Sequence, residues 1–97
     1  MTILRHYKMT AAEGRGGELR AALIELGAKV ELLSGCEKVE LFADMKDGAT
    51  YVFVEHWRSV EDHKAAGQAL GKDAFAPVGA TLAAPPEGRY LEAVPLG

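Results

Sequence analysis

Apolar residues recur at two different spacings along the chain, and the spacing separates expected helices from expected strands. Between Leu19 and Leu33 they recur every three or four residues, the period of one helix face, and Ser34-Gly35 ends the segment. A second helix is expected from Ser59 to about Leu70, because Ser59 and Asp62 have the spacing of a capping box. One or two further helical turns are expected within Asp73–Ala83, with Pro77 near the start.

Shorter apolar runs predict strands, at Ile3–Met9, Glu37–Asp44, Tyr51–Trp57 and Arg89–Val94. Asp47-Gly48 lies between the two middle runs and predicts a hairpin, since both residues tolerate positive φ. The resulting order is βαββαβ. It predicts an α+β, ferredoxin-like domain over residues 1–97, with both helices on one face of a four-stranded antiparallel sheet.

The strand Tyr51–Trp57 is apolar on both of its faces. Tyr51, Phe53 and Trp57 point to one side, whereas Val52 and Val54 point to the other. A sheet covered by helices on one face normally alternates apolar and polar residues. A second copy of the chain, packed sheet against sheet, would cover the other face, so a homodimer is expected. The alternative is an ordinary strand with two exposed valines.

Composition narrows the class of protein. The chain has 97 residues, a formal net charge of −3 and one cysteine, and 48% of its residues are hydrophobic. The charge argues against binding to nucleic acid, and a single cysteine cannot form an internal disulfide. No run reaches the length of a membrane span, and the N-terminus lacks an apolar signal segment, so a cytoplasmic protein that does not bind membranes is expected.

Three segments carry a resemblance to a known family. The stretches Glu13–Leu23 (EGRGGELRAAL), Leu32–Phe42 (LLSGCEKVELF) and Tyr51–His63 (YVFVEHWRSVEDH) resemble conserved segments of the antibiotic biosynthesis monooxygenase-like family. Glu55-x-Trp57 at a strand end and Gly35-Cys36 before the preceding strand are the most specific parts. In much of that family a histidine follows the tryptophan by nine residues; here that position is Ala66, and His63 lies six residues after Trp57.

The resemblance implies a dimeric α/β barrel with a pocket between sheet and helices in each subunit. It also implies a cofactor-independent monooxygenase that acts on a small phenolic or quinol-type aromatic molecule. Two alternatives stay open on the same fold, namely a non-catalytic ligand-binding or stress-response module and a haem-binding or haem-degrading protein.

Such oxygenation requires an apolar pocket and a base that takes a phenolic proton. His63 is the candidate catalytic base, since the ordinary pKa of histidine lies nearest neutrality; the alternative is a histidine that simply lies in the first turn of a helix. The candidate substrate-binding residues are Trp57, Tyr51, His6 and Phe75, although aromatic side chains also suit a core. His6 can face either the pocket or the dimer interface.

The remaining polar residues are expected to be structural. Glu55 needs a partner on an apolar strand face, and Arg5 on the neighbouring strand is the expected one. His56 is expected to point away from Trp57. The three histidines match no ligand spacing, so neither a metal nor another cofactor is expected.

Overall fold

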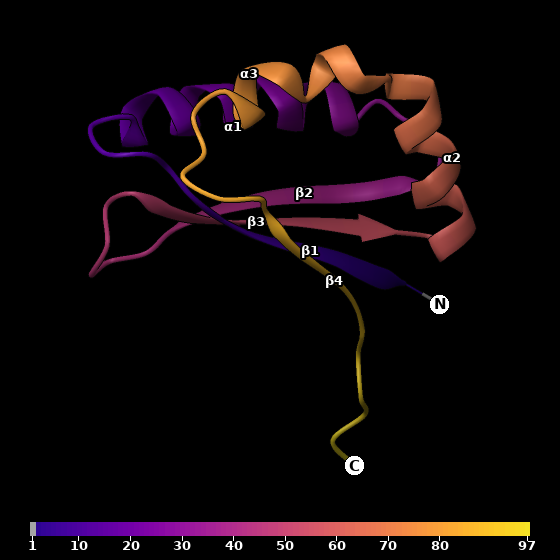
Figure 1. Ribbon diagram of the computed structural model, residues 1–97. Coiled ribbons are helices and arrows are strands. Elements are labelled where there is room, and N and C mark those ends of the chain that lie inside the picture. Colours follow the sequence, from indigo (N-terminus) through magenta and orange to yellow (C-terminus); the bar gives the residue numbers. More distant parts are fainter. Residues whose placement is uncertain (1) are drawn as a thin grey trace.

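A computed structural model describes residues 2–97 as a four-stranded sheet with three α-helices (Figure 1). The elements, in chain order, are β1 (Ile3–Thr10), α1 (Gly16–Val30), β2 (Cys36–Ala43), β3 (Thr50–Trp57), α2 (Val60–Leu70), the 3-10 turn η1 (Lys72–Ala74), α3 (Ala76–Gly79) and β4 (Glu87–Glu92). The predicted βαββαβ order and the α+β fold class are therefore confirmed.

The sheet has the strand order β2-β3-β1-β4, and every neighbouring pair is antiparallel. In the central pair, Arg5 lies opposite Glu55 and Tyr7 lies opposite Phe53. On the other side of β1, Tyr90 of β4 lies opposite Arg5. Because side chains alternate along a strand, these five residues share one face of the sheet.

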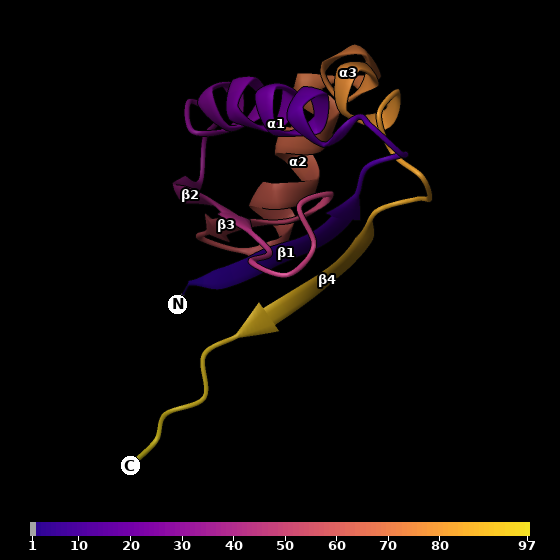
Figure 2. The ribbon, with the colours of Figure 1, turned by 90° about the vertical axis from the view of Figure 1, so that its left-hand side faces the viewer.

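All helices lie over that same face (Figures 1 and 2). Helix α1 turns its periodic apolar side to the sheet, with Leu19 and Leu23 fully buried. They pack with Phe53 and Trp57 in one hydrophobic cluster, so the core fills the space between the sheet and the helices. No helix within residues 2–97 has both the length and the apolar character that a membrane crossing requires.

The junctions around α2 explain how the helix is positioned. The Ser59 hydroxyl accepts a hydrogen bond from the Asp62 backbone N–H at 3.1 Å, as the capping-box spacing predicts. Helix α1 ends at Val30, three residues before the predicted end. The chain then turns back to β2 through Gly35, which has φ +88°. The Asp62 side chain lies directly against Gly35 and ties the start of α2 to this turn.

The β2–β3 hairpin is present, but its turn differs from the prediction. Residues 44–49 form the loop, and Gly48 does not have positive φ. Two aspartate side chains hold the loop instead: Asp44 accepts hydrogen bonds from the backbone N–H groups of Lys46 and Asp47, and Asp47 accepts from that of Ala49 and from the Thr50 hydroxyl.

The C-terminal part agrees with the prediction in outline only. Residues 72–83 contain η1 and the short α3, with Pro77 in the first turn of α3 as expected. Strand β4 begins at Glu87 and ends at Glu92, two residues earlier at each end than predicted.

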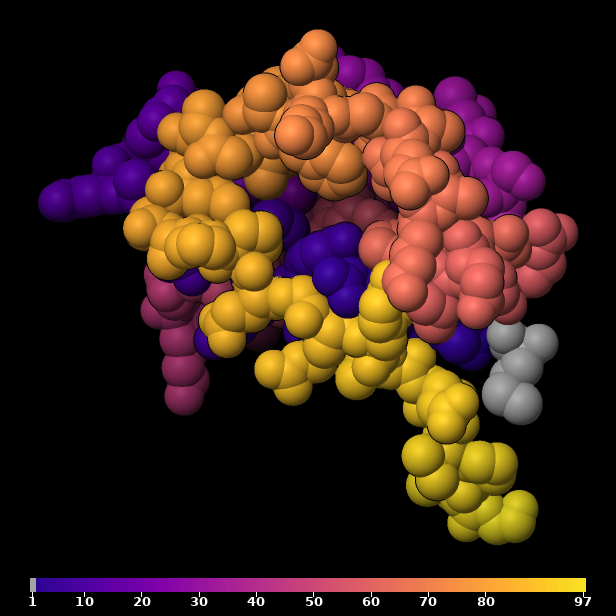
Figure 3. All heavy atoms as spheres, turned by 45° about the vertical axis from the view of Figure 1, so that its right-hand side comes forward, coloured from indigo at the N-terminus to yellow at the C-terminus, as the bar shows by residue number. Residues whose placement is uncertain are grey.

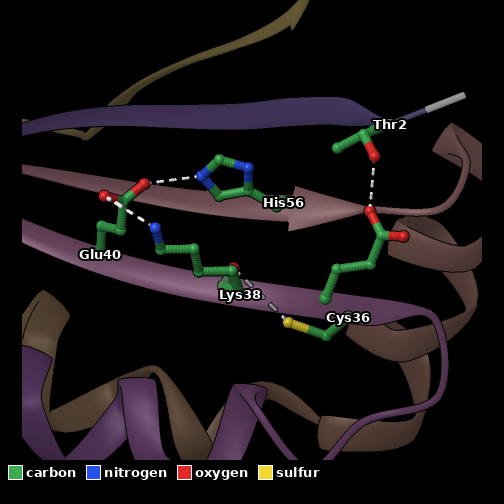
Figure 4. Close-up of polar contacts among 6 residues, drawn as sticks. Thr2, Cys36, Lys38, Glu40 and His56 are labelled. Carbon is green, nitrogen blue, oxygen red and sulfur yellow. Dashed lines mark hydrogen bonds and ion pairs between the residues drawn. The ribbon is translucent and has the colours of Figure 1, made fainter.

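The second face of the sheet has no helix over it (Figure 2). It carries Val52 and Val54 of β3, together with the exposed Phe42 and Leu91 from the edge strands. His56 also lies on this face, pointing away from Trp57 as predicted. Its Nε2 lies 2.6 Å from Glu40 Oε1, and Lys38 contacts the same carboxylate (Figure 4). The two-sided apolar character of β3 is thus real.

Replacing Gly35 with alanine tests the junction between α1, β2 and α2. A Cβ at this position would lie 2.6 Å from the Asp62 Cβ and would occupy a positive-φ backbone. We expect Gly35→Ala to lower the free energy of unfolding by about 1–3 kcal/mol in urea titrations. Gly17→Ala is the matched control, because a Cβ added at position 17 would have no atom within 4 Å and alanine favours the helix. Equal stability of the two variants would contradict this description of the turn.

Candidate functional site

A cavity of about 370 Å³ lies between the helix-covered face of the sheet and the segments α1, α3 and the loop before β4. Figure 3 shows the opening, with indigo atoms of the N-terminal segment at its floor between the orange and yellow C-terminal segments. The size is within the range of small-molecule sites. Its lining is almost entirely apolar and consists of Tyr7, Met9, Leu26, Phe53, Glu55, Phe75, Val78, Gly79, Leu82 and Pro86.

Tyr7 connects this cavity to a histidine between two tyrosines. The Tyr7 hydroxyl oxygen lies 3.3 Å from His63 Nε2, and the Tyr90 hydroxyl oxygen lies 2.7 Å from His63 Nδ1. The three side chains come from β1, α2 and β4. Both nitrogens of the imidazole are therefore engaged, and the ring orientation is fixed from two sides.

Glu55 is the second polar group in the cavity wall. It is 3% exposed, and its Oε1 accepts a hydrogen bond from the Trp57 indole N–H at 2.8 Å. The same oxygen lies 3.7 Å from His63 Nε2. Trp57 also packs edge-on against the His63 ring, with ring centroids 5.5 Å apart. Trp57 thus orients both the carboxylate and the imidazole.

Arg5 lies beside this group rather than in an ion pair. Its guanidinium carbon is 4.9 Å from the centre of the Tyr7 ring and 4.4 Å from that of Tyr90, as in cation–π contacts. Gly88 leaves room for this stack, since a Cβ there would lie 2.7 Å from Arg5 Nη2. Arg5 was the expected partner of Glu55, but the Trp57 indole donates the hydrogen bond to Glu55 instead. The Nε of Arg5 is buried and has no hydrogen-bond partner among residues 2–97.

Burial dominates the electrostatics of the site. It raises the pKa of Glu55 above its ordinary value, against the opposing effects of the Trp57 hydrogen bond and the Arg5 charge. It also raises the pKa of Tyr7. It lowers the pKa of His63, and the positive charges of Arg5 and Lys64 lower it further. At neutral pH His63 is consequently a neutral imidazole, the form that can accept a proton.

The residues predicted from sequence fall into three groups. Phe75 lines the cavity, and His63 and Trp57 lie in the polar group at its end. Tyr51 is on the same sheet face but belongs to the hydrophobic core and does not line the cavity. His6 is on the opposite face, because Arg5 and Tyr7 on either side of it face the helices, and His6 does not line this cavity.

Tyr7 and Tyr90 were not singled out from the sequence. Both lie in predicted strands, at positions 7 and 90, yet their approach to His63 depends on which strands flank β1. Alternation of polar and apolar residues in β1 could have indicated which face of the strand is buried. Both faces of β1 contain polar and apolar residues, however, so the alternation does not identify the buried face.

Among residues 2–97, no three His, Cys, Asp or Glu side chains are grouped so that they could hold a metal ion. Cys36 is a half-buried thiol at the start of β2, with its Sγ 3.9 Å from the Lys38 carbonyl oxygen (Figure 4). Burial raises the pKa of this thiol, which disfavours the reactive thiolate.

Comparison with known proteins identifies the family. Residues 2–75 match the model of the antibiotic biosynthesis monooxygenase family. The chain belongs to this family. A candidate antibiotic biosynthesis monooxygenase from Chloroflexus aurantiacus shares 30% sequence identity over all of this chain and 95% of its own length, with a TM-score of 0.78.

Other solved structures have the same fold. A candidate antibiotic biosynthesis monooxygenase from Caulobacter crescentus is 26% identical over 97% of this chain and 91% of its own, with a TM-score of 0.83. One from Bordetella bronchiseptica has a TM-score of 0.84 at 20% identity, over 96% and 97% of the two chains. No curated protein matches the sequence.

The buried carboxyl of Glu55 makes stability depend on pH in a defined direction. Because its pKa is raised in the folded state, Glu55 contributes stability below its ordinary pKa near 4.5 that is lost as the pH rises through the folded-state pKa. Glu55→Gln keeps an oxygen for the Trp57 indole but cannot ionise. We expect urea unfolding to show that the variant gains stability relative to the wild type as the pH rises above the ordinary pKa of 4.5, until Glu55 is ionised in the folded wild type as well.

The matched control for this measurement is Glu13→Gln, which changes an exposed carboxylate in the loop before α1. It should follow the wild-type pH dependence throughout. If Glu55→Gln instead loses stability relative to the wild type as the pH rises, the folded state stabilises the carboxylate and the pKa of Glu55 is lowered rather than raised.

Proposed function

We propose that the protein is a cofactor-independent monooxygenase that oxidises a small phenolic or quinol-type aromatic molecule in the cavity. Family membership supports monooxygenase chemistry in general. The more specific proposal, a phenolic or quinol substrate with His63 as the base, rests on the position of Tyr7. Tyr7 lines the cavity, and its hydroxyl oxygen lies 3.3 Å from Nε2 of the neutral His63.

The cavity suits a flat aromatic molecule with a polar edge. Phe53 and Phe75 offer aromatic contacts in a wall that is otherwise mostly aliphatic. Tyr7 and Glu55 are the only ionisable side chains among the lining residues, so a phenolic hydroxyl has its hydrogen-bond partners at that end. Because the opposite lining is apolar, the molecule is oriented with its hydroxyl toward His63.

In the proposed reaction, His63 takes up the phenolic proton through the Tyr7 hydroxyl. Tyr7 passes its own proton to His63 Nε2 as it accepts the proton of the substrate. The resulting electron-rich anion reacts with O₂. One oxygen atom is added to the substrate, and the other leaves as water with two hydrogen atoms of the substrate. The substrate therefore supplies all the electrons, and no flavin or metal is needed.

The haem alternative gains no support from this geometry. His63, its candidate axial ligand, has both ring nitrogens within hydrogen-bond distance of tyrosine hydroxyls and is not part of the cavity lining. A non-catalytic protein would bind a ligand in the same cavity without oxidising it. Measurement of oxygen uptake distinguishes the two functions, because only the monooxygenase consumes O₂.

Oxygen uptake with a panel of quinols and phenols tests the proposal. We expect one O₂ consumed per substrate, without added cofactor and without oxygen return when catalase is added. His63→Gln should lower kcat at least about a hundredfold, the smaller end of what a positioned base contributes. Gln68→Ala, an exposed position on the same helix, is the control and should keep wild-type rates.

Two results would oppose the proposal. Equal rates for the wild type and His63→Gln would remove His63 from the mechanism. Saturable binding of the panel compounds without oxygen uptake would favour the non-catalytic module.

We also propose that two copies associate through the sheet face that carries no helix. The support is the apolar surface there, with Phe42 50% and Leu91 39% exposed beside the partly buried Val52. Monomeric proteins seldom expose a contiguous apolar face of this kind to water. In a twofold dimer this face of one copy would pack against the same face of the other.

Sedimentation of the wild type at micromolar concentration should give a dimer. Phe42→Glu introduces a charge at the proposed interface and should shift the equilibrium at least tenfold toward monomer. Ile24→Glu is the matched control, because Ile24 is 58% exposed on α1, on the helical side of the molecule. A monomeric wild type, or equal dissociation of both variants, would contradict the proposed interface.

A further inference from the structure

His63 is held between two hydroxyl groups that differ in their surroundings. A neutral imidazole has one N–H donor and one nitrogen acceptor, so the two tyrosines cannot play the same role toward it. Tyr7 is half-buried in the wall of an apolar cavity, whereas Tyr90 belongs to the edge strand β4 and is 38% exposed. The energetic cost of each tautomer depends on this difference.

Two arrangements of hydrogens fit the distances. In the first, the Tyr7 O–H donates to Nε2, and the Nδ1–H donates to the Tyr90 oxygen. In the second, the Tyr90 O–H donates to Nδ1, and the Nε2–H donates to the Tyr7 oxygen. The second leaves the Tyr7 hydrogen directed at an apolar cavity, where a buried donor without a partner costs about 1–3 kcal/mol. The first leaves the Tyr90 hydrogen to water, which costs little.

We propose that Tyr90 is a positioning residue that holds His63 in the tautomer with its proton on Nδ1, so that the lone pair of Nε2 faces Tyr7 and the cavity. The Tyr90 oxygen accepts a hydrogen bond from the Nδ1–H, and the oxygen and Nδ1 lie 2.7 Å apart. The Tyr90 ring reinforces the arrangement, because it stands edge-on to His63 with centroids 5.4 Å apart and is stacked on Arg5.

Every element around His63 contributes to the balance between the tautomers. The groups that face it are Arg5 and Tyr7 from β1, Glu55 from β3, Lys64 on its own helix and Tyr90 from β4. Glu55 favours the opposite tautomer, since its carboxylate lies 3.7 Å from Nε2 and would attract a proton there. Tyr90 opposes this pull by supplying the acceptor for the Nδ1–H. In Tyr90→Phe that hydrogen loses its protein partner, and the attraction of Glu55 for a proton on Nε2 then favours the Nε2–H form.

The consequence for catalysis rests on the proposed function. Only an unprotonated Nε2 can accept the Tyr7 proton. The value of kcat is therefore proportional to the fraction of His63 that is in the Nδ1–H tautomer. If Tyr90→Phe converts about nine-tenths of His63 to the Nε2–H form, kcat should fall about tenfold. Because the cavity lining is unchanged, KM should change less than twofold.

Nitrogen-15 NMR of the imidazole rings measures the tautomer without any substrate. The chain has three histidines, and His63→Gln assigns the signals of His63 by their disappearance. We expect the wild type to carry the proton on Nδ1 of His63 at neutral pH. Tyr90→Phe should shift the population toward Nε2–H, while the signals of His6 and His56 on the opposite sheet face stay unchanged.

Glu92→Gln is the matched control for damage to β4. Glu92 lies two residues after Tyr90 on the same strand and face and is exposed. It should leave both the His63 tautomer and kcat at wild-type values, whereas general loosening of β4 would affect both variants alike.

Two NMR results would overturn the inference: a wild type that is mainly Nε2–H, or a Tyr90→Phe variant that keeps the wild-type tautomer. Absence of oxygen uptake by the wild type would count against the proposed monooxygenase function and leave the tautomer result valid. A tautomer shift with kcat unchanged would overturn the catalytic consequence alone.

Discussion

The pairing of β1 with β3 is the constraint on which the candidate site depends. In this register Arg5 and Tyr7 face the helices opposite Glu55 and Phe53. A slip by one residue would turn every side chain of β1 to the other face, exchanging Tyr7 for His6. The apolar members of both strands pack under α1, so the burial of Phe53 and Trp57 maintains the register that also places the polar groups.

The same packing sets the chemical character of those groups. An apolar environment penalises ionised carboxylates and imidazolium ions, so Glu55 has a raised pKa and His63 a lowered one. The Trp57 indole compensates part of this cost by hydrogen bonding to Glu55. The result is a neutral proton acceptor next to an apolar cavity, which is the combination that proton transfer from a phenol in a low-dielectric site requires. Fold, burial and proposed chemistry thus have one physical origin.

The sequence predicts the framework well because periodicity and capping are local. The order of elements, the capping of α2 by Ser59 and the two apolar faces of β3 are all visible in short windows of residues. The hairpin turn differs from the prediction in detail, since two aspartate side chains, rather than positive φ at Gly48, stabilise the loop.

The site is less accessible to sequence reasoning because it joins residues from β1, β3, α2 and β4. Strand β1 alternates mixed polar and apolar residues on both faces, so nothing local distinguishes the face of His6 from that of Tyr7. Tyr90 reaches His63 only because β4 pairs with β1, a contact between the two ends of the chain. The resemblance to the family indicated a pocket but not these tyrosines.

The most direct measurement of the central claim is a crystal structure of the protein with a non-oxidisable phenol of quinol size, determined under anaerobic conditions. The phenol is expected in the cavity, with its hydroxyl oxygen about 2.5–3.0 Å from the Tyr7 hydroxyl and its ring against Phe53 and Phe75. A phenol bound with its hydroxyl away from Tyr7 and Glu55, or bound outside the cavity, would contradict the proposed role of the cavity and of Tyr7.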